Sequence, residues 1–113
     1  MPENRSRVDL SATDGAAGGP TVVALQGDVD LLVAQTLVAR LDALTARPRH
    51  DLVLDLRQVG FIDCTGLGIL CRARNRSLAR QGRLRLVTDS ADLLRLLRAT
   101  GLADVFEVQP RLP

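Results

Sequence analysis

The feature that most constrains the fold of this chain is a regular alternation of two hydrophobic patterns. Short apolar runs, typical of strands, alternate with longer segments whose apolar residues recur at the three- and four-residue spacing of helices. The expected order is two strands, then helix, strand, helix, strand and helix, with room for a last short strand. Because strands joined through a helix run parallel, this order predicts an α/β fold with a mixed sheet of four or five strands packed against three or four helices.

Turn and capping residues set the expected boundaries. The strands are expected at 8–13, 21–26, 52–56, 83–88 and within 103–108, and the helices at 32–47, from Thr65 to Gln81 and from Ala91 to Gly101. The first two strands should form a hairpin around a glycine-rich loop, which adds an antiparallel pair to a parallel core. The continuous apolar run at 52–56 is typical of a strand covered on both faces, whereas 83–88 alternates and is expected nearer a sheet edge. Asp30 is placed to cap the first helix, and Ser90 or Asp89 to cap the third.

Composition excludes several classes of protein. The 113 residues, 46% hydrophobic and 25% charged, are expected to form one domain with a ragged polar start at residues 1–7. Phe61 and Phe106 are the only aromatic residues, so leucine, valine, isoleucine and alanine must build the core. A net charge of +2 is too weak a field to favour nucleic acid. With no signal sequence and no apolar run near the ~18 residues of a membrane span, the expected location is the cytoplasm.

Cysteine and histidine are not expected to carry chemistry. Cys64 and Cys71 match no metal-binding pattern, and on one helix they lie about 10 Å apart, too far for a disulfide. His50, the only histidine, lies in a basic turn and is interpreted as solvated. An enzyme using Cys64 as nucleophile would lack a base, and Leu70 and Ser77 stand where a C-x5-R phosphatase loop requires arginine. We therefore expect no catalytic residue, no metal and no cofactor.

Three motifs carry a resemblance to a known family. Residues 55–70 read DLRQVGFIDCTGLGIL, residues 27–30 read GDVD, and residues 100–108 read TGLADVFEV. The first is similar to the pattern D-L-x-x-V-x-F-[IM]-D-S-[ST]-G-L-x-x-L of STAS-domain anti-sigma factor antagonists. The other two resemble that family's G-[ED]-[LV]-D turn and its usual ending. The likeness follows the family's order, spans most of residues 8–108 and implies the STAS fold, with a binding module in place of an enzyme.

The resemblance also implies a switch between partners. In that family, an anti-sigma factor that is itself a serine/threonine kinase binds the unmodified antagonist and thereby releases its sigma factor. Phosphorylation ends the binding, and a phosphatase reverses the modification. By motif position the acceptor is Thr65, with Asp63 two residues before it. Cys64 replaces a serine common in the family, which leaves one hydroxyl to modify; it is either an inert small side chain or a redox-sensitive thiol at a helix start.

The residues alone leave other roles open for this segment. Thr65 could be only the N-cap of the helix that it begins, and Asp63 only a turn residue whose carboxylate accepts from nearby amides. If Thr65 is the acceptor, a phosphate of about −1.5 to −2 charge beside Asp63 and Asp28 should repel a partner fitted to a neutral hydroxyl. The two readings are compatible.

The helix after Thr65 is expected to present one face to a partner. Its apolar stripe is predicted to consist of Leu67, Leu70, Cys71 and Leu78. Ile69 would then point away from the core, together with Arg72, and contact a partner. The expected partner-binding residues are Asp28, Asp30, Asp63, Cys64, Gly66, Leu67, Ile69 and Arg72.

A second role within the same fold is that of a stand-alone STAS subunit of a bacterial transport assembly. Other domains of this family are attached to anion transporters, and the lack of an apolar span argues against that arrangement here. The intact acceptor motif around Thr65 favours sigma-factor signalling over transport.

Overall fold

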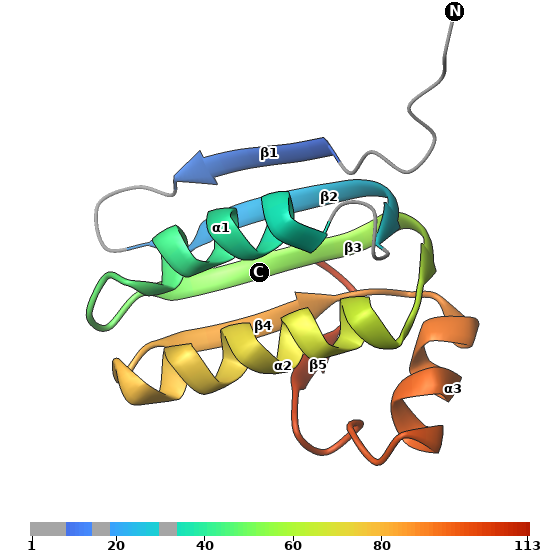
Figure 1. Cartoon of the computed structure of the whole chain (residues 1–113). Helices are drawn as coiled ribbons and strands as arrows, with labels where there is room; N and C mark the ends of the chain where they lie inside the picture. Colours follow the sequence, from blue (N-terminus) through green and yellow to red (C-terminus); the bar gives the residue numbers. More distant parts are fainter. Residues whose placement is uncertain (1–8, 15–18, 30–33) are drawn as a thin grey trace, which may run out of the picture.

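The computed structural model of the protein describes residues 9–14, 19–29 and 34–113 (Figure 1). In chain order the elements are β1 (Asp9–Asp14), β2 (Thr21–Val29), α1 (Ala34–Thr45), β3 (Asp51–Ile62), α2 (Cys64–Ala79), β4 (Arg83–Val87), α3 (Ala91–Ala99) and β5 (Glu107–Gln109). This is the order predicted from the hydrophobic pattern, including the last short strand. The predictions of a ragged start at 1–7 and of a cap at Asp30 lie outside the described residues.

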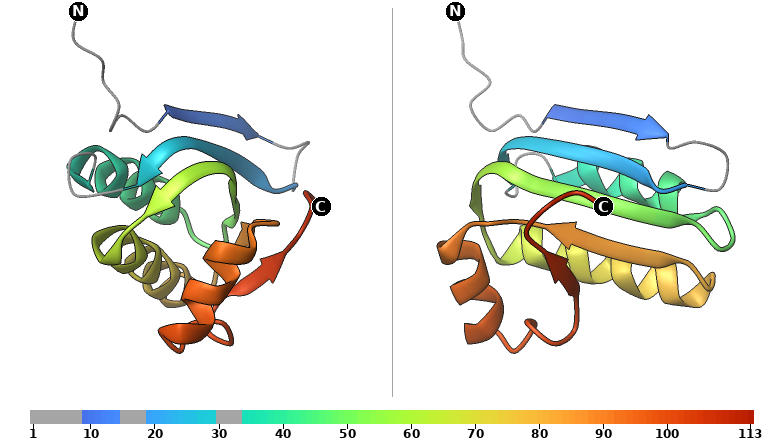
Figure 2. Two further views of the ribbon diagram at one scale, coloured as in Figure 1. Left: turned by 90° about the vertical axis from the view of Figure 1, so that its right-hand side faces the viewer. Right: turned by 180° about the vertical axis from the view of Figure 1, so that it is seen from behind.

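The five strands form one twisted sheet in the order β1-β2-β3-β4-β5 (Figure 2). β1 and β2 are antiparallel, with Asp9 opposite Gln26 and Asp14 opposite Thr21, so the predicted hairpin is confirmed. β2 pairs with β3, β3 with β4, and β4 with β5, all in parallel. The predicted mixed sheet with a parallel core and three helices is therefore confirmed.

Two neighbouring strands are longer than predicted. β2 continues to Val29, past the predicted end at Gln26, and β3 has 12 residues and continues to Ile62, far beyond the predicted end at Leu56, because the two strands stay paired through two register shifts. β4 lies next to the edge strand β5, nearer an edge than β3 as predicted, although all but the first of its residues are buried. The extension of β3 is what carries the chain directly to the beginning of α2.

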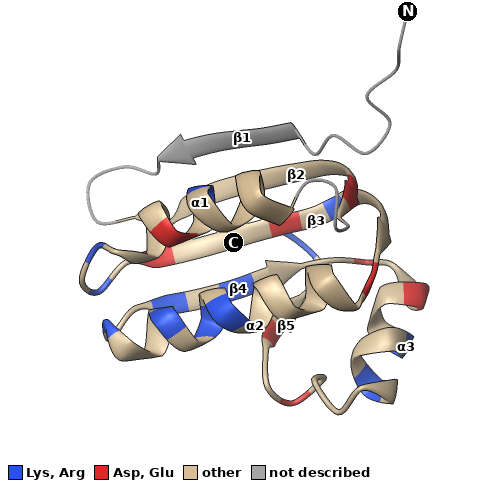
Figure 3. Ribbon diagram, in the orientation of Figure 1, with Lys and Arg blue, Asp and Glu red and all other residues tan. Residues whose placement is uncertain are grey.

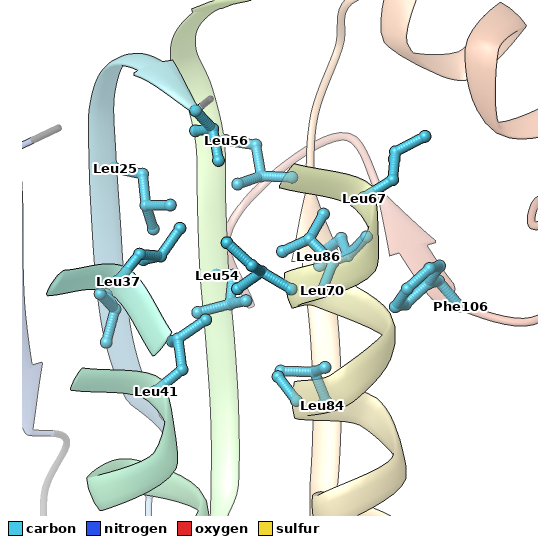
Figure 4. Packing of buried hydrophobic residues seen from close by; sticks show 14 of the residues in the cluster. Leu25, Leu37, Leu41, Leu54, Leu56, Leu67, Leu70, Leu84, Leu86 and Phe106 are labelled. Atoms are coloured by element: carbon cyan, nitrogen blue, oxygen red, sulfur yellow. The ribbon is translucent and has the colours of Figure 1, made fainter. Parts of the chain in front are cut away.

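The main core lies between the sheet and the pair α1 and α2 (Figure 4). Alternate residues of the central strands point to this side, and leucines of both helices fill the space above them. Burying each leucine side chain contributes roughly 1.5–3 kcal/mol to stability. The largest fully buried side chains of this core are Leu25, Leu37, Leu41, Leu52, Leu54, Leu56, Leu70, Leu86 and Leu97.

The opposite face of the sheet carries buried charge. By strand alternation, Asp55 and Arg85 point away from the leucine core, and both are buried. Arg85 donates to Asp51 at 2.9 Å, and Arg57 makes two side-chain hydrogen bonds of 2.9 Å with Asp55. The hydrogen bonds from Arg57 hold the pKa of Asp55 below its usual value. The chain beyond β5 crosses this face behind the central strands (Figure 2).

The stripe predicted for α2 is confirmed at Leu67 and Leu70, which are buried, and at Cys71, which packs against the core, but it is wrong at Leu78 and it omitted Ile69. Ile69 is only 6% exposed and belongs to the core, whereas Leu78 is 57% exposed. The buried row also contains the small residues Gly66, Ala73 and Ser77, which let the helix approach the sheet closely. A prediction based on hydrophobicity alone omits these small residues from the buried face of the helix. On the same helix, Arg74 donates from Nε to the carbonyl oxygen of Val105 at 3.1 Å.

The prediction that His50 is solvated is also wrong. Its Nδ1 lies 2.7 Å from the carbonyl oxygen of Arg47, and its Nε2 lies 2.7 Å from the hydroxyl of the buried Ser77. The ring also fills the space beside Gly82, where an added Cβ would lie 2.6 Å from it. His50 therefore joins the loop before β3 to the last turn of α2.

Candidate functional site

The candidate site lies where β3 passes into α2. Asp63 has extended backbone angles (φ −104°, ψ −173°), and its carboxylate accepts a 2.9 Å hydrogen bond from the amide of Gly66. Its carbonyl oxygen accepts from the amide of Leu67 at 2.9 Å. Asp63 is thus the N-cap of α2, and the alternative in which Thr65 caps the helix is wrong, because Thr65 is the second residue inside it.

The end of β2 lies beside this junction, which brings two of the sequence motifs together. The amide of Asp63 donates to the carbonyl oxygen of Val29 at 3.3 Å, and Asp28 is paired with Phe61 across the two strands. An added Cβ on Gly60 would lie 3.3 Å from a carboxylate oxygen of Asp28. Two segments more than 30 residues apart in the chain therefore form one acidic surface around the start of α2.

Gly66 fixes how closely the helix approaches these strands. An added Cβ would lie 2.6 Å from Ile62 Cγ1 and 2.7 Å from the carbonyl oxygen of Val29, closer than real contacts allow. Gly68, by contrast, is exposed and would meet nothing within 4 Å. The glycine before Leu67 is therefore a packing requirement, and any partner-binding role for Gly66 must be indirect because the residue is buried.

Three side chains remain accessible at the beginning of α2. Cys64 is exposed, Thr65 is half-buried, and Phe61 at the end of β3 is 54% exposed. Within the described part of the chain, the Thr65 hydroxyl makes no hydrogen bond. Phe61 was missed as a candidate, although one of only two aromatic residues at the end of a predicted motif was a usable signal.

The remaining predicted partner-binding residues are placed differently from expectation. Leu67 and Ile69 are buried in the core and have no free face for a partner. Arg72 is exposed, but its guanidinium is bound to Asp42 of α1 by hydrogen bonds of 3.0 and 2.8 Å. The hydrogen bond from Arg72 holds the pKa of Asp42 below its usual value. Arg72 therefore joins the two helices, and Asp30 lies outside the described residues.

The cysteine, histidine and acidic side chains that the structure describes do not form a cluster of metal ligands at this junction. In the ranges that the structure describes, no three His, Cys, Asp or Glu side chains come together as metal ligands. Cys64 begins α2, whereas His50 contacts Ser77 in its last turn, a separation of roughly 20 Å along the helix. The accessible polar groups at this junction are the thiol of Cys64 and the hydroxyl of Thr65, beside the carboxylates of Asp28 and Asp63.

A groove adjoins the site on the side of α3. It has a volume of about 210 Å³ and lies between the last residues of β3 and the first turns of α3. α3 begins next to this groove. Ser90 accepts a 3.2 Å hydrogen bond from the amide of Leu93, which confirms Ser90 as the predicted cap of α3. Phe61 and Leu93 both line the groove.

Comparison with known proteins gives the family. The STAS domain model matches residues 8–113, so the chain belongs to the STAS domain family, as its motifs indicated. The anti-sigma-B factor antagonist of Listeria monocytogenes is 32% identical over 83 residues, covering 74% of this chain and 73% of its own.

Solved structures agree with this assignment. An anti-sigma factor antagonist from Mycobacterium paratuberculosis superposes with a TM-score of 0.83 at 27% identity, covering 95% of this chain and 89% of its own. A sulfate transporter family protein from Wolinella succinogenes gives a TM-score of 0.66 at 26% identity, covering 77% and 73%. No helix among the described residues is long and apolar enough to cross a membrane.

Proposed function

We propose that the protein is a cytoplasmic anti-sigma factor antagonist that acts by binding and not by catalysis. Its relatives of known name in the STAS family include anti-sigma factor antagonists that cover most of its length. The observation that carries the proposal is the half-buried Thr65 hydroxyl, free of hydrogen bonds to the described residues, at the second position of a helix capped by Asp63.

The proposed partner is an anti-sigma factor with serine/threonine kinase activity. In the unmodified state, it binds the surface around Cys64 and Thr65, together with the carboxylates of Asp28 and Asp63, and its sigma factor is released. The kinase then phosphorylates Thr65, and the phosphorylated protein dissociates until a phosphatase removes the phosphate. Arg72 is exposed but paired with Asp42, so any contribution that it makes to this contact is made as part of that ion pair.

Electrostatics would drive the release. A phosphate adds a charge of about −1.5 to −2. Placed on Thr65, it would stand beside the Asp63 cap and near Asp28, and the surface would change from neutral at its centre to strongly negative. The first-turn amides of Cys64 and Thr65 lack acceptors among the described residues and offer partial positive charge to the phosphate. Binding is therefore lost by repulsion and bulk, with little change in the fold.

One experiment tests the proposal directly. Immobilised wild type, Thr65→Glu and Thr65→Val are each incubated with cytoplasm of the source organism, and captured proteins are identified by mass spectrometry. We expect wild type and Thr65→Val to capture a histidine-kinase-like ATPase that Thr65→Glu does not retain. The purified ATPase should transfer phosphate to wild type only. Equal capture by all three variants, or capture of no such ATPase, would contradict the proposal.

The second candidate function is that of a stand-alone subunit of a transport assembly. The structural match to a sulfate transporter family protein favours it. In that case, the captured proteins would be membrane transport components, and Thr65→Glu would retain them as well as wild type does.

A further inference from the structure

The groove between β3 and α3, here called the α3 groove, has a floor that the protein leaves unfilled. Its apolar lining includes Phe61 and Ile62 of β3 and Leu93 and Leu96 of α3. Phe61 is 54% exposed, whereas the other phenylalanine, Phe106, is 6% exposed and packs in the core. A volume of about 210 Å³ is enough for one large side chain and too small for most cofactors.

The border of the α3 groove is acidic. Asp92 is part of its lining, and Asp28 approaches its Gly60 wall, where an added Cβ would lie 3.3 Å from the Asp28 carboxylate. Asp89 directly precedes the lining residue Ser90 and is exposed. In Figure 3 the end of β2, the β3–α2 connection and the start of α3 carry acidic residues, while the α1–β3 loop and the second half of α2 are basic.

The arginines near the groove neutralise only part of this border, because Arg95 compensates Asp92 whereas Asp28 and Asp89 form no ion pair among the described residues. Arg57 is bound by two hydrogen bonds to Asp55, and Arg95 is paired with Asp92 at 2.9 Å on the surface of α3. Asp28 forms no ion pair among the described residues, and Asp89 has only the longer-range attraction of Arg57, whose guanidinium is already bound by Asp55. An apolar floor whose border remains negative overall suits an apolar side chain flanked by positive charge.

The α3 groove is continuous with the candidate site. Ile62 lines the groove, Asp63 follows it as the helix cap, and Thr65 lies two residues further. Asp28 borders both surfaces, since it contacts the Gly60 wall and lies across from Phe61 in β3. A protein that covers Thr65 therefore also reaches the groove.

We propose that the α3 groove binds an aliphatic or aromatic side chain, flanked by lysine or arginine, from the partner that reads Thr65. The identity of that partner rests on the proposed function, whereas the chemistry of the groove does not. Phe61 is the anchor of this contact, and Asp28 and Asp89, which form no ion pair among the described residues, select positive neighbours. The groove adds affinity and specificity next to the hydroxyl that is modified.

A peptide titration tests the groove without knowledge of the partner. Full-length ¹⁵N-labelled protein is titrated with the blocked peptide Arg-Leu-Leu-Arg and, as a matched control, with Glu-Leu-Leu-Glu. We expect amide shift changes at Phe61, Leu93 and Leu96 with the basic peptide, and an affinity at least about tenfold lower for the acidic one. Equal affinities, or shifts centred elsewhere, would overturn the proposal. So would shifts at these residues on raising the protein concentration alone, because the occupant would then be a second copy of the chain.

A pair of variants connects the groove to the proposed function. Phe61→Ser and Leu78→Ser each remove one large, exposed apolar side chain. Phe61 lies just before the first residue of α2, and Leu78 lies in its last turn. Against the purified ATPase from the capture experiment, we expect Phe61→Ser to bind at least about tenfold more weakly and Leu78→Ser to bind as wild type. Equal binding by both variants overturns the groove contact and leaves the Thr65 switch intact. If wild type binds no ATPase while the basic peptide still binds the groove, the proposed function fails and the groove stands.

Discussion

At its first residue, α2 meets the ends of β2 and β3; at its last, it meets the loop before β3 and the start of β4. The second junction is closed by hydrogen bonds. His50 connects Arg47 to Ser77, each at 2.7 Å, and the amide of Arg49 donates to the carbonyl oxygen of Arg80 at 2.9 Å. Arg49 adopts a positive φ of 52° to make this connection.

The first junction is closed only in part. Asp63 caps the helix, and Gly66 lets it pack closely against Val29. Thr65, however, has no partner among the described residues, and Phe61 is largely exposed. Both ends of α2 contribute to the fold, but only the first leaves a hydroxyl and an aromatic ring accessible, which agrees with the proposed partner contact there. The following variants test that proposed division.

The largest expected effect is on stability at the partner end. Gly66→Ala should lower the free energy of unfolding by about 3 kcal/mol, because the new Cβ would clash with Val29 and Ile62. Gly68→Ala is the matched control. It meets nothing within 4 Å and should raise stability by about 0.5–1 kcal/mol, since alanine favours the helix. Urea unfolding of both variants makes the measurement, and similar values for the two would disprove the close seating of α2.

The next prediction concerns the last turn of α2, where a substitution should lower stability without changing the affinity for the partner. Ser77→Ala removes the buried hydroxyl that contacts His50 and should cost about 1–2 kcal/mol. Thermal unfolding measures the loss, and calorimetry with the purified ATPase should show unchanged affinity. A weakened partner affinity in a folded Ser77→Ala protein would break the proposed division between the two ends.

A smaller effect is expected at the cap. Asp63→Ala should cost about 1 kcal/mol through loss of the hydrogen bond to the Gly66 amide. Asp63→Asn keeps a capping oxygen and should retain most of the stability, while removing one negative charge beside Thr65. Chemical unfolding compares the two variants. If Asn is as destabilising as Ala, the charge of Asp63 matters to the fold and not only its capping oxygen.

The smallest effect concerns pH. Arg57 hydrogen bonds lower the pKa of Asp55 in the folded protein from its usual 3.8, so the ionised carboxylate stabilises the fold. This stabilisation is complete above the usual pKa and is lost as pH falls through the lowered one. Asp55→Asn should therefore cost less than about 1 kcal/mol at pH 7, since Arg57 is partly exposed. The difference between Asn and wild type should shrink as the pH falls below 3.8 and through the lowered pKa of Asp55. Unfolding curves recorded from pH 7 into the acid range would detect a difference that persists.

Much of the fold could be predicted because it depends on local patterns. Alternating hydrophobicity gave the order of elements, the hairpin and the parallel core, and Ser90 was recognisable as a cap. The length of β3 could not be predicted, because its second half is held by pairing with the end of β2 and not by its own apolar residues. The orientation of α2 depends on small residues such as Ala73, which let the helix pack close to the sheet.

The sequence motif located the candidate site, but it did not predict which of the site's side chains are exposed. The position of Thr65 at the start of α2 followed from the motif, but which neighbours remain accessible depends on tertiary packing. Ile69 is buried because α2 rotates its row of small residues toward the sheet. Phe61 is exposed because β3 runs past the core before it ends. The pairing of His50 with Ser77 joins residues 27 apart and has no local signal.

The most direct test of the central claim is the affinity of the purified ATPase for the protein before and after complete phosphorylation at Thr65, measured by calorimetry. Amide spectra of the two forms are recorded alongside. We expect phosphorylation to weaken binding at least about tenfold, with spectral changes confined to the first turn of α2 and its neighbours. Unchanged affinity, or a loss of affinity accompanied by spectral changes throughout the sheet, would contradict a local electrostatic switch at Thr65.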